Sequence, residues 1–214
     1  MKKIFKSILA ILLLTSLVFA VTGCNKKNNS NNNEAGVEDG KSKTYNALKK
    51  VFSGNEYTIS FEQKDGSKVK LATKGDNIFM DATEEGEHLS IIQKDGKTYV
   101  ISHDEKMYMV SEGEEGEMLD KNEFEIISKD DLAKIENSQY KTGKETIDGK
   151  EYEYEEYVNS DNLTERYYFE GKDLKYIKTI DEDGEEEIMK IVEMSSTVND
   201  SVFEIPADYE KVDI

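Results

Sequence analysis

His88 and His103 are the only two histidines in the chain, and they flank a candidate hairpin turn at Asp95-Gly96. With a two-residue loop, the two imidazoles would face each other across the hairpin and could ligate a metal ion such as zinc. With a three-residue loop, His88 would oppose Ser102 and His103 would oppose Glu87, so the histidines would lie on opposite faces. The loop type therefore decides whether the chain contains a histidine pair.

The hairpin at Asp65-Gly66 provides a guide to the loop type. A three-residue loop ending at Gly66 pairs apolar residues with each other, whereas a two-residue loop places Phe61 opposite Lys70. The favoured pairs are Phe61 with Val69, Ile59 with Leu71, and Glu62 with Lys68.

Applied at Gly96, the same loop pairs Leu89 with Ile101 and Ile91 with Tyr99. The two histidines then lie apart, and two histidines without a third ligand at metal spacing are a weak signal. The sequence therefore predicts exposed histidines at strand ends, and neither a metal site nor a cofactor.

Three motifs imitate the signature of penicillin-binding proteins: Ser67-x-x-Lys70, Lys141-Thr142-Gly143 and Ser160-Asp161-Asn162. Their order along the chain is wrong for that family, and Ser67 leaves a hairpin turn instead of opening a helix. No other assembled nucleophile, base or phosphate-binding loop stands out. The sequence therefore predicts no catalytic residues and a protein that is not an enzyme.

The charge is strongly acidic, with a net value of −18. From residue 41 onward there are 23 basic and 43 acidic side chains, which argues against nucleic acid as a partner because phosphates would be repelled. The acidic run at 181–187 is shorter than a twelve-residue calcium loop and lacks flanking helices, so it indicates a solvated turn. A basic partner is compatible with this charge.

Cys24 is the only cysteine, and it follows a basic head, an apolar run from Ile8 to Val21, and the small residues Thr22 and Gly23. This order resembles the bacterial lipobox. The resemblance implies cleavage between Gly23 and Cys24 and a lipid on the Cys24 sulfur. Residues 1–23 are then a lipoprotein signal peptide, and residues 24–40 are a lipidated cysteine with a flexible, asparagine-rich tether. We expect the protein to be secreted and lipid-anchored at the outer face of the cell membrane, in a Gram-positive cell.

Residues 41–214 have the length of a single domain. Two short helices are predicted, in "KTYNALKKVFSG" and in "IISKDDLAKIEN", where Ser128 and Asp131 form a capping-box pattern. Most of the remainder consists of strands separated by Asp-Gly turns, ending with a strand at "SVFEI" before Pro206. The predicted fold class is α+β: a long, curved antiparallel sheet of about nine or ten strands with short helices on its concave face.

The closing segment "VNDSVFEIPADYEKV", with Asp200, Phe203, Pro206 and Tyr209, resembles the end of the LolA-like half-barrel superfamily. That group includes the mycobacterial lipoproteins LppX and LprG and uncharacterised clostridial lipoproteins. The resemblance covers roughly Lys41 to Val212. It implies an apolar cavity between sheet and helices that holds acyl chains, and it implies no catalytic residues.

Two functions follow from these patterns. The first is a non-catalytic binding protein that holds an apolar or lipid ligand, such as an acyl chain, in the half-barrel. The alternative is an interaction protein with a filled core, whose acidic surface docks a basic partner of the cell envelope. The candidate ligand-binding residues are Leu48, Phe52, Ile59, Phe61, Leu71, Leu89, Ile91, Tyr99, Ile101, Leu132 and Ile135.

Overall fold

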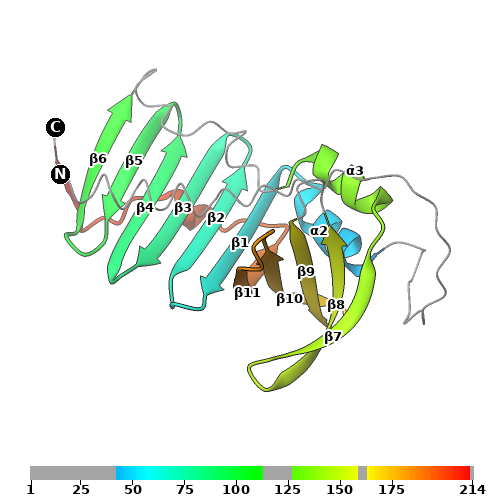
Figure 1. Cartoon of the computed structure of the whole chain (residues 1–214). Helices are drawn as coiled ribbons and strands as arrows, with labels where there is room; N and C mark the ends of the chain where they lie inside the picture. Colours follow the sequence, from blue (N-terminus) through cyan, green and yellow to red (C-terminus); the bar gives the residue numbers. More distant parts are fainter. Residues whose placement is uncertain (1–41, 113–126, 159–162, 213–214) are drawn as a thin grey trace. The chain divides into compact units, whose positions relative to one another are not determined.

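The computed structural model describes residues 42–112, 127–158 and 163–212 (Figure 1). These residues form two α-helices, one short 3-10 helix and twelve strands. Within each compact part, neighbouring strands pair antiparallel, except for the parallel pair β12 (Glu210–Lys211) and β6 (Met107–Glu112). The α+β class predicted from the sequence is confirmed, with more strands than expected. No helix within the described ranges is long and apolar enough to cross a membrane.

The described residues divide into two compact units. The first contains residues 54–112 and 192–212, and the second contains residues 42–53, 127–158 and 163–191. The predicted single domain from residue 41 stays a prediction. The predicted signal peptide and tether, residues 1–40, lie outside the described residues.

Successive hairpins build the first unit. Its strands are β1 (Glu56–Gln63), β2 (Lys68–Lys74), β3 (Asn77–Glu84), β4 (Glu87–Lys94), β5 (Lys97–Ser102) and β6 (Met107–Glu112), each paired with the next. The β1–β2 register is as predicted: Phe61 pairs with Val69, and Gly66 adopts a φ of 90° in the turn. A side chain at that φ would be strained, so glycine favours this loop.

The turn between β4 and β5 contains two residues, and the predicted register there is wrong. Lys94 pairs with Lys97, and Asp95 and Gly96 both have positive φ, 54° and 71°. These values match a type I′ turn, for which Asp-Gly is a preferred sequence. Leu89 consequently pairs with Ser102 and Ile91 with Val100, instead of with Ile101 and Tyr99. Apolar pairing could not decide here, because the doublets Ile91-Ile92 and Tyr99-Val100 place apolar side chains opposite each other in either register.

The two faces of this sheet carry different partners. On the first face, Ile92 and Ile101 pack with Phe203 from the C-terminal segment. Half-buried apolar residues of the strands and of the C-terminal segment join this cluster. The second face carries the alternate residues of the same strands: Ile59, Leu71, Met80, Leu89 and Ile91, all buried. Tyr99 and Ile101, predicted on the ligand face, belong to the first face because of the register change.

The C-terminal segment over the first face is not the strand that the sequence predicts. Asp200–Phe203 forms a 3-10 helix, η3, in which the Asn199 side chain accepts the Ser201 N–H. This local cap competes with extended structure. The segment is tied to the sheet by Lys74 with Asp200 at 2.5 Å, and it ends in β12 (Glu210–Lys211) beside β6.

The second unit contains α2 (Lys43–Phe52), α3 (Lys129–Asn137), and the strands β7 (Lys141–Ile147), β8 (Lys150–Val158), β9 (Thr164–Glu170) and β10 (Asp173–Ile180). The first part of β11 (Glu186–Ser195) pairs with β10. The predicted capping box of Ser128 and Asp131 is confirmed at the start of α3. Helix α2 contacts both α3 and β10.

A buried carboxylate caps helix α2. Glu155, on β8, accepts the backbone N–H of Lys43 at 2.8 Å and that of Thr44 at 2.9 Å. Its side chain also accepts the Tyr157 hydroxyl at 3.1 Å, and the residue is only 5% exposed. Negative charge at a helix N-terminus is favourable, and here it satisfies donors that the helix itself leaves unpaired.

Candidate functional site

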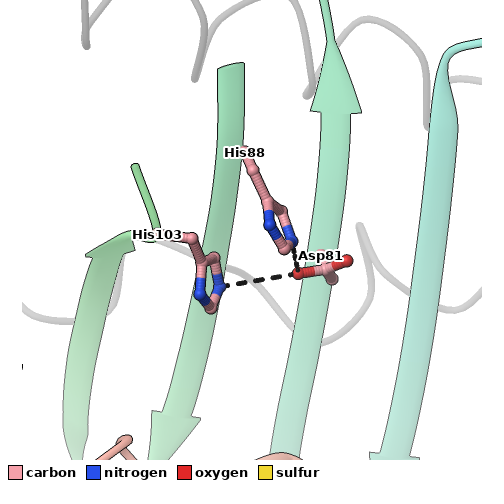
Figure 2. A group of neighbouring side chains, drawn as sticks. All are labelled: Asp81, His88 and His103. Carbon is pink, nitrogen blue, oxygen red and sulfur yellow. Dashed lines mark hydrogen bonds and ion pairs between the residues drawn. The ribbon is translucent and has the colours of Figure 1, made fainter. Parts of the chain in front are cut away.

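Asp81, His88 and His103 converge on the first face of the sheet of the first unit (Figure 2). Asp81 lies in the middle of β3, His88 at the start of β4, and His103 directly after β5. The two-residue turn places the histidines opposite each other, and the His103 N–H donates to the His88 carbonyl oxygen at 3.0 Å. The expectation that the histidines lie on opposite faces is therefore wrong. The prediction of no metal site rested on that register and on the lack of a third ligand at metal spacing, and Asp81 now lies beside both histidines.

The nitrogen and oxygen atoms of the three side chains lie close together. The imidazole rings stack with centroids 4.0 Å apart and an interplanar angle of 21°. His88 Nε2 is 2.8 Å from Asp81 Oδ1, and His103 Nε2 is 3.7 Å from the same oxygen. One ligand atom from each residue lies within 4.8 Å of the other two. Both ring nitrogens thus face one carboxylate oxygen.

Ser90 and Tyr209 complete a hydrogen-bonded chain around His103. The Ser90 hydroxyl donates to Asp81 Oδ1 at 2.6 Å and lies 2.6 Å from His103 Nε2. The single hydroxyl hydrogen of Ser90 points to Asp81. The hydrogen of the bond between Ser90 and His103 must therefore come from His103 Nε2. His103 Nδ1 then accepts from the Tyr209 hydroxyl at 2.9 Å. For a neutral His103, this network corresponds to the Nε2–H tautomer.

The surroundings favour this neutral form. Partial burial lowers the pKa of His103, and the neighbouring His88 lowers that pKa further, while Asp81 and Asp104 oppose the shift. A neutral imidazole is the form that ligates metal ions. The neutral form of His103 is therefore present at a lower pH than for an ordinary histidine.

The exposure of the cluster separates two kinds of chemistry. The side chains of His88, Asp81 and His103 are 37%, 27% and 22% exposed, whereas Ser90 is 2% exposed. Ser90 beside a histidine and an aspartate resembles an activated nucleophile, but it is buried and its proton is directed at Asp81. The half-exposed groups can hold a ligand at the surface, and they are the described residues that could hold a metal ion.

The candidate apolar ligand residues fall into three groups. Leu48 and Phe52 lie on α2, and Leu132 and Ile135 lie on α3, where all four are buried in the second unit. In the first unit, Ile59, Leu71, Leu89 and Ile91 are buried on the second face, and Phe61 is half-buried there. Tyr99 and Ile101 lie on the first face, in the cluster with Phe203.

A surface groove in the second unit has a volume of about 1030 Å³ beside α3, the start of β7 and the end of β8. None of the candidate apolar residues lines it. Its walls mix charged and apolar side chains, among them Lys134, Tyr140, Glu156 and Val158. The groove is therefore unlike the apolar cavity that the sequence resemblance implies.

Other sequence candidates are distributed as follows. Ser67 lies in the β1–β2 loop, and Lys141 opens β7, far along the chain from each other. Cys24 and Gly23 lie outside the described residues, as do Ser160, Asp161 and Asn162.

Sequence reasoning missed Asp81, although a lone carboxylate between the apolar residues Met80 and Ala82 is a signal. It also missed the contact of Tyr209 with His103, which no local pattern indicates.

No protein-family model and no curated protein matches this chain. Among solved structures, the chain is similar to an uncharacterized conserved protein from Thermus thermophilus. The identity is 8%, the match covers 79% of this chain and 96% of that one, and the TM-score is 0.42.

A LolA superfamily protein from Nitrosomonas europaea is also similar, with 14% identity, 77% and 97% coverage, and a TM-score of 0.28. MucB in complex with MucA(peri) shows 12% identity, 79% and 60% coverage, and a TM-score of 0.37. At such values these likenesses carry no argument about function. Function is therefore inferred from this chain's own residues.

Proposed function

We propose that the protein is a non-catalytic, lipid-anchored, extracytoplasmic binding protein of the LppX and LprG type, with an apolar ligand such as an acyl chain. The second face of the first unit is the proposed floor for that ligand. The observation that carries the proposal is the cluster of apolar side chains on this face across β1 to β5, which Thr73, Gln93 and Thr98 border at one end. Its buried members are Tyr57, Ile59, Val69, Leu71, Ile78, Met80, Ala82, Leu89, Ile91 and Val100.

The corrected register sharpens the proposal. Ile91 and Ile92 are neighbours in β4, both nearly fully buried, and they point to opposite faces of the sheet. Ile92 packs with Ile101 and Phe203 on the first face. Because the C-terminal segment occupies that face, an acyl chain is proposed on the side of Ile91.

The adjacent isoleucines provide a matched pair for the test. The full chain in detergent is titrated with cis-parinaric acid, a fluorescent fatty acid, using Ile91→Phe and Ile92→Phe. Both changes overfill the sheet surface by a similar volume, so circular dichroism should report similar folding. We expect Ile91→Phe to weaken binding by about tenfold, because the ring takes the space of the acyl chain, and Ile92→Phe to bind as the parent does. No saturable binding to the parent, or equal effects of both variants, would contradict the proposal.

The anchor is supported by the order of basic head, apolar run and small residues before Cys24. Each buried methylene of an acyl group adds roughly 0.8 kcal/mol of membrane affinity, so two chains hold a protein firmly. Labelling cells with a tagged palmitate analogue should mark the protein, and Cys24→Ser should lose both the label and the membrane fraction. A parent protein without label would refute the anchor and leave the ligand proposal standing.

The acidic surface favours a second candidate function, docking of a basic envelope protein. The hairpin tip at 182–185 is exposed, and the backbone N–H groups of Asp183 and Glu185 donate to the Asp181 carboxylate. This leaves several carboxylates of one sign in solvent, which attract a basic partner in a salt-dependent way. Crosslinking on intact cells should recover such a partner, and recovery should fall as ionic strength rises. No partner at low salt would count against this function.

A further inference from the structure

We propose that Asp81, His88 and His103 form a binding site for a divalent first-row transition-metal ion, with zinc as the reference ion. This inference goes beyond the proposed function, since it concerns the first face of the sheet instead of the apolar second face. It rests on the donor set, on the spacing of the donors, and on the groups that orient them.

The donor set selects the class of ion. Two imidazole nitrogens and one carboxylate oxygen suit zinc, nickel, cobalt and copper, whereas calcium and magnesium prefer oxygen ligands alone. The three residues come from three consecutive segments, β3, β4 and the turn after β5. Three protein ligands leave at least one coordination position for water. The partial exposure of all three side chains allows that water to enter.

The spacing is close to that of a bound ion. Metal–ligand bonds of about 2.0–2.1 Å at a tetrahedral angle separate the donor atoms by roughly 3.3 Å. The two distances from Asp81 Oδ1, 2.8 Å to His88 Nε2 and 3.7 Å to His103 Nε2, lie on either side of that value. Because the rings stack nearly parallel with centroids 4.0 Å apart, both imidazoles must tilt out of this stack for their nitrogen lone pairs to converge on one ion, while the hairpin holds the backbone.

Two further groups orient the ligands. Tyr209 contacts His103 Nδ1, the ring nitrogen away from Asp81, and Ser90 donates to the Asp81 carboxylate. On metal binding, the His103 proton moves from Nε2 to Nδ1, and Nδ1–H then donates to the Tyr209 oxygen. The Ser90–His103 contact is exchanged for a metal–nitrogen bond, while Ser90 keeps its bond to Asp81. Such partners of ligating histidines are a regular part of metal sites.

The composition of the chain makes the test direct. With only two histidines in 214 residues, imidazole NMR signals report on this site alone, provided that the protein carries no histidine tag. The full, untagged chain in detergent is titrated with zinc chloride, with nuclear magnetic resonance of the imidazole protons and calorimetry in parallel. We expect both imidazole signals to shift together and to saturate at one equivalent. Shifts of neither or only one imidazole would overturn the proposal.

Variants assign the ligands. His88→Gln, His103→Gln and Asp81→Asn should each weaken zinc binding by about tenfold or more, and Tyr209→Phe by a smaller factor. Asp95→Asn is the matched control, because it removes one carboxylate from the turn at the opposite end of the β4–β5 hairpin and suits its positive φ of 54°. A Cys24→Ser background excludes the thiol as a ligand. Binding that survives His88→Gln, or that falls equally in Asp95→Asn, would overturn the proposal.

Discussion

The two units of the molecule treat their polar side chains in different ways. In the second unit, Glu145 accepts hydrogen bonds from Tyr168 at 2.6 Å, from Lys178 at 2.5 Å and from Arg166 at 3.0 Å. Burial opposes ionisation there, but the bonds from Lys178 and Tyr168 dominate and lower the pKa of Glu145. In the first unit, Asp81 faces two half-exposed imidazoles that are stacked on each other.

This difference separates structural polar groups from candidate ligands. A carboxylate that accepts hydrogen bonds from several protein donors, as Glu145 and Glu155 do, stabilises the fold and has few lone pairs left to bind a ligand. The Asp81 cluster instead directs two ring nitrogens at one oxygen and remains open to solvent. Removing a group of the first kind should cost stability, whereas removing a group of the second kind should cost binding.

The largest expected effect is on the cap of α2. Glu155→Ala removes a buried carboxylate from the N–H groups of Lys43 and Thr44, and we expect a loss of about 3 kcal/mol in the free energy of unfolding. Glu153→Ala is the matched control, because Glu153 reaches the same helix only through a surface ion pair with the Lys43 amine. Its cost should be below about 1 kcal/mol. Urea unfolding followed by circular dichroism measures both.

The same unfolding experiment tests whether Asp81 differs from the structural carboxylates of the second unit. Asp81→Asn should cost less than about 1 kcal/mol, since the side chain is partly exposed and Ser90 retains an acceptor. If Asp81→Asn destabilises the protein as much as Glu155→Ala does, the cluster is a structural element like those of the second unit.

The second effect concerns pH. Burial raises the pKa of Glu165 to about 7, against an opposing hydrogen bond from Tyr167 at 2.9 Å. Between the usual value near 4.5 and about 7, the folded state therefore binds more protons than the unfolded state. Stability falls as pH rises through this window, by up to about 3 kcal/mol. Glu165→Gln should flatten this fall, as measured by urea unfolding from about pH 4.5 to 8. Parallel curves for parent and variant would contradict the assignment.

A third effect concerns packing at the edge of the second unit. Gly143 on β7 pairs with Tyr154 on β8, and a methyl group at Gly143 would collide with the tyrosine ring and hydroxyl. We expect Gly143→Ala to cost about 1–2 kcal/mol, because the ring must move away from the Arg166 guanidinium 4.9 Å from its centroid. In a Tyr154→Ala background the same change should cost nearly nothing. Additive costs would show that the ring does not cover Gly143.

The smallest effect tests the turn that creates the histidine pair. Asp95→Val should cost about 1 kcal/mol, because a β-branched residue is strained at the positive φ of 54°. Asp95→Asn should be close to neutral, since Asn-Gly suits a type I′ turn. Thermal unfolding compares the two. Equal stability of both variants would argue for the three-residue loop and against the pairing of the histidines.

The sequence predicted the elements of this fold well and the candidate site poorly. Capping residues such as Ser128 and positive-φ glycines such as Gly66 act locally, so both helices and the first hairpin were predictable. The second hairpin was not, because its apolar doublets fit two registers and the turn alone distinguishes them. The contact of Tyr209 with His103 joins residues 106 positions apart, and no local pattern encodes it. A one-residue error in register therefore hid the histidine pair.

The most direct test of the central claim, that Asp81, His88 and His103 bind one transition-metal ion together, is X-ray absorption at the zinc edge. The sample is the untagged full chain in detergent with slightly less than one equivalent of zinc. The account predicts a first shell of nitrogen and oxygen with the outer-shell scattering of two imidazoles per zinc. A spectrum with oxygen ligands alone would contradict it, because zinc would then be held by the acidic surface instead of by the histidine pair.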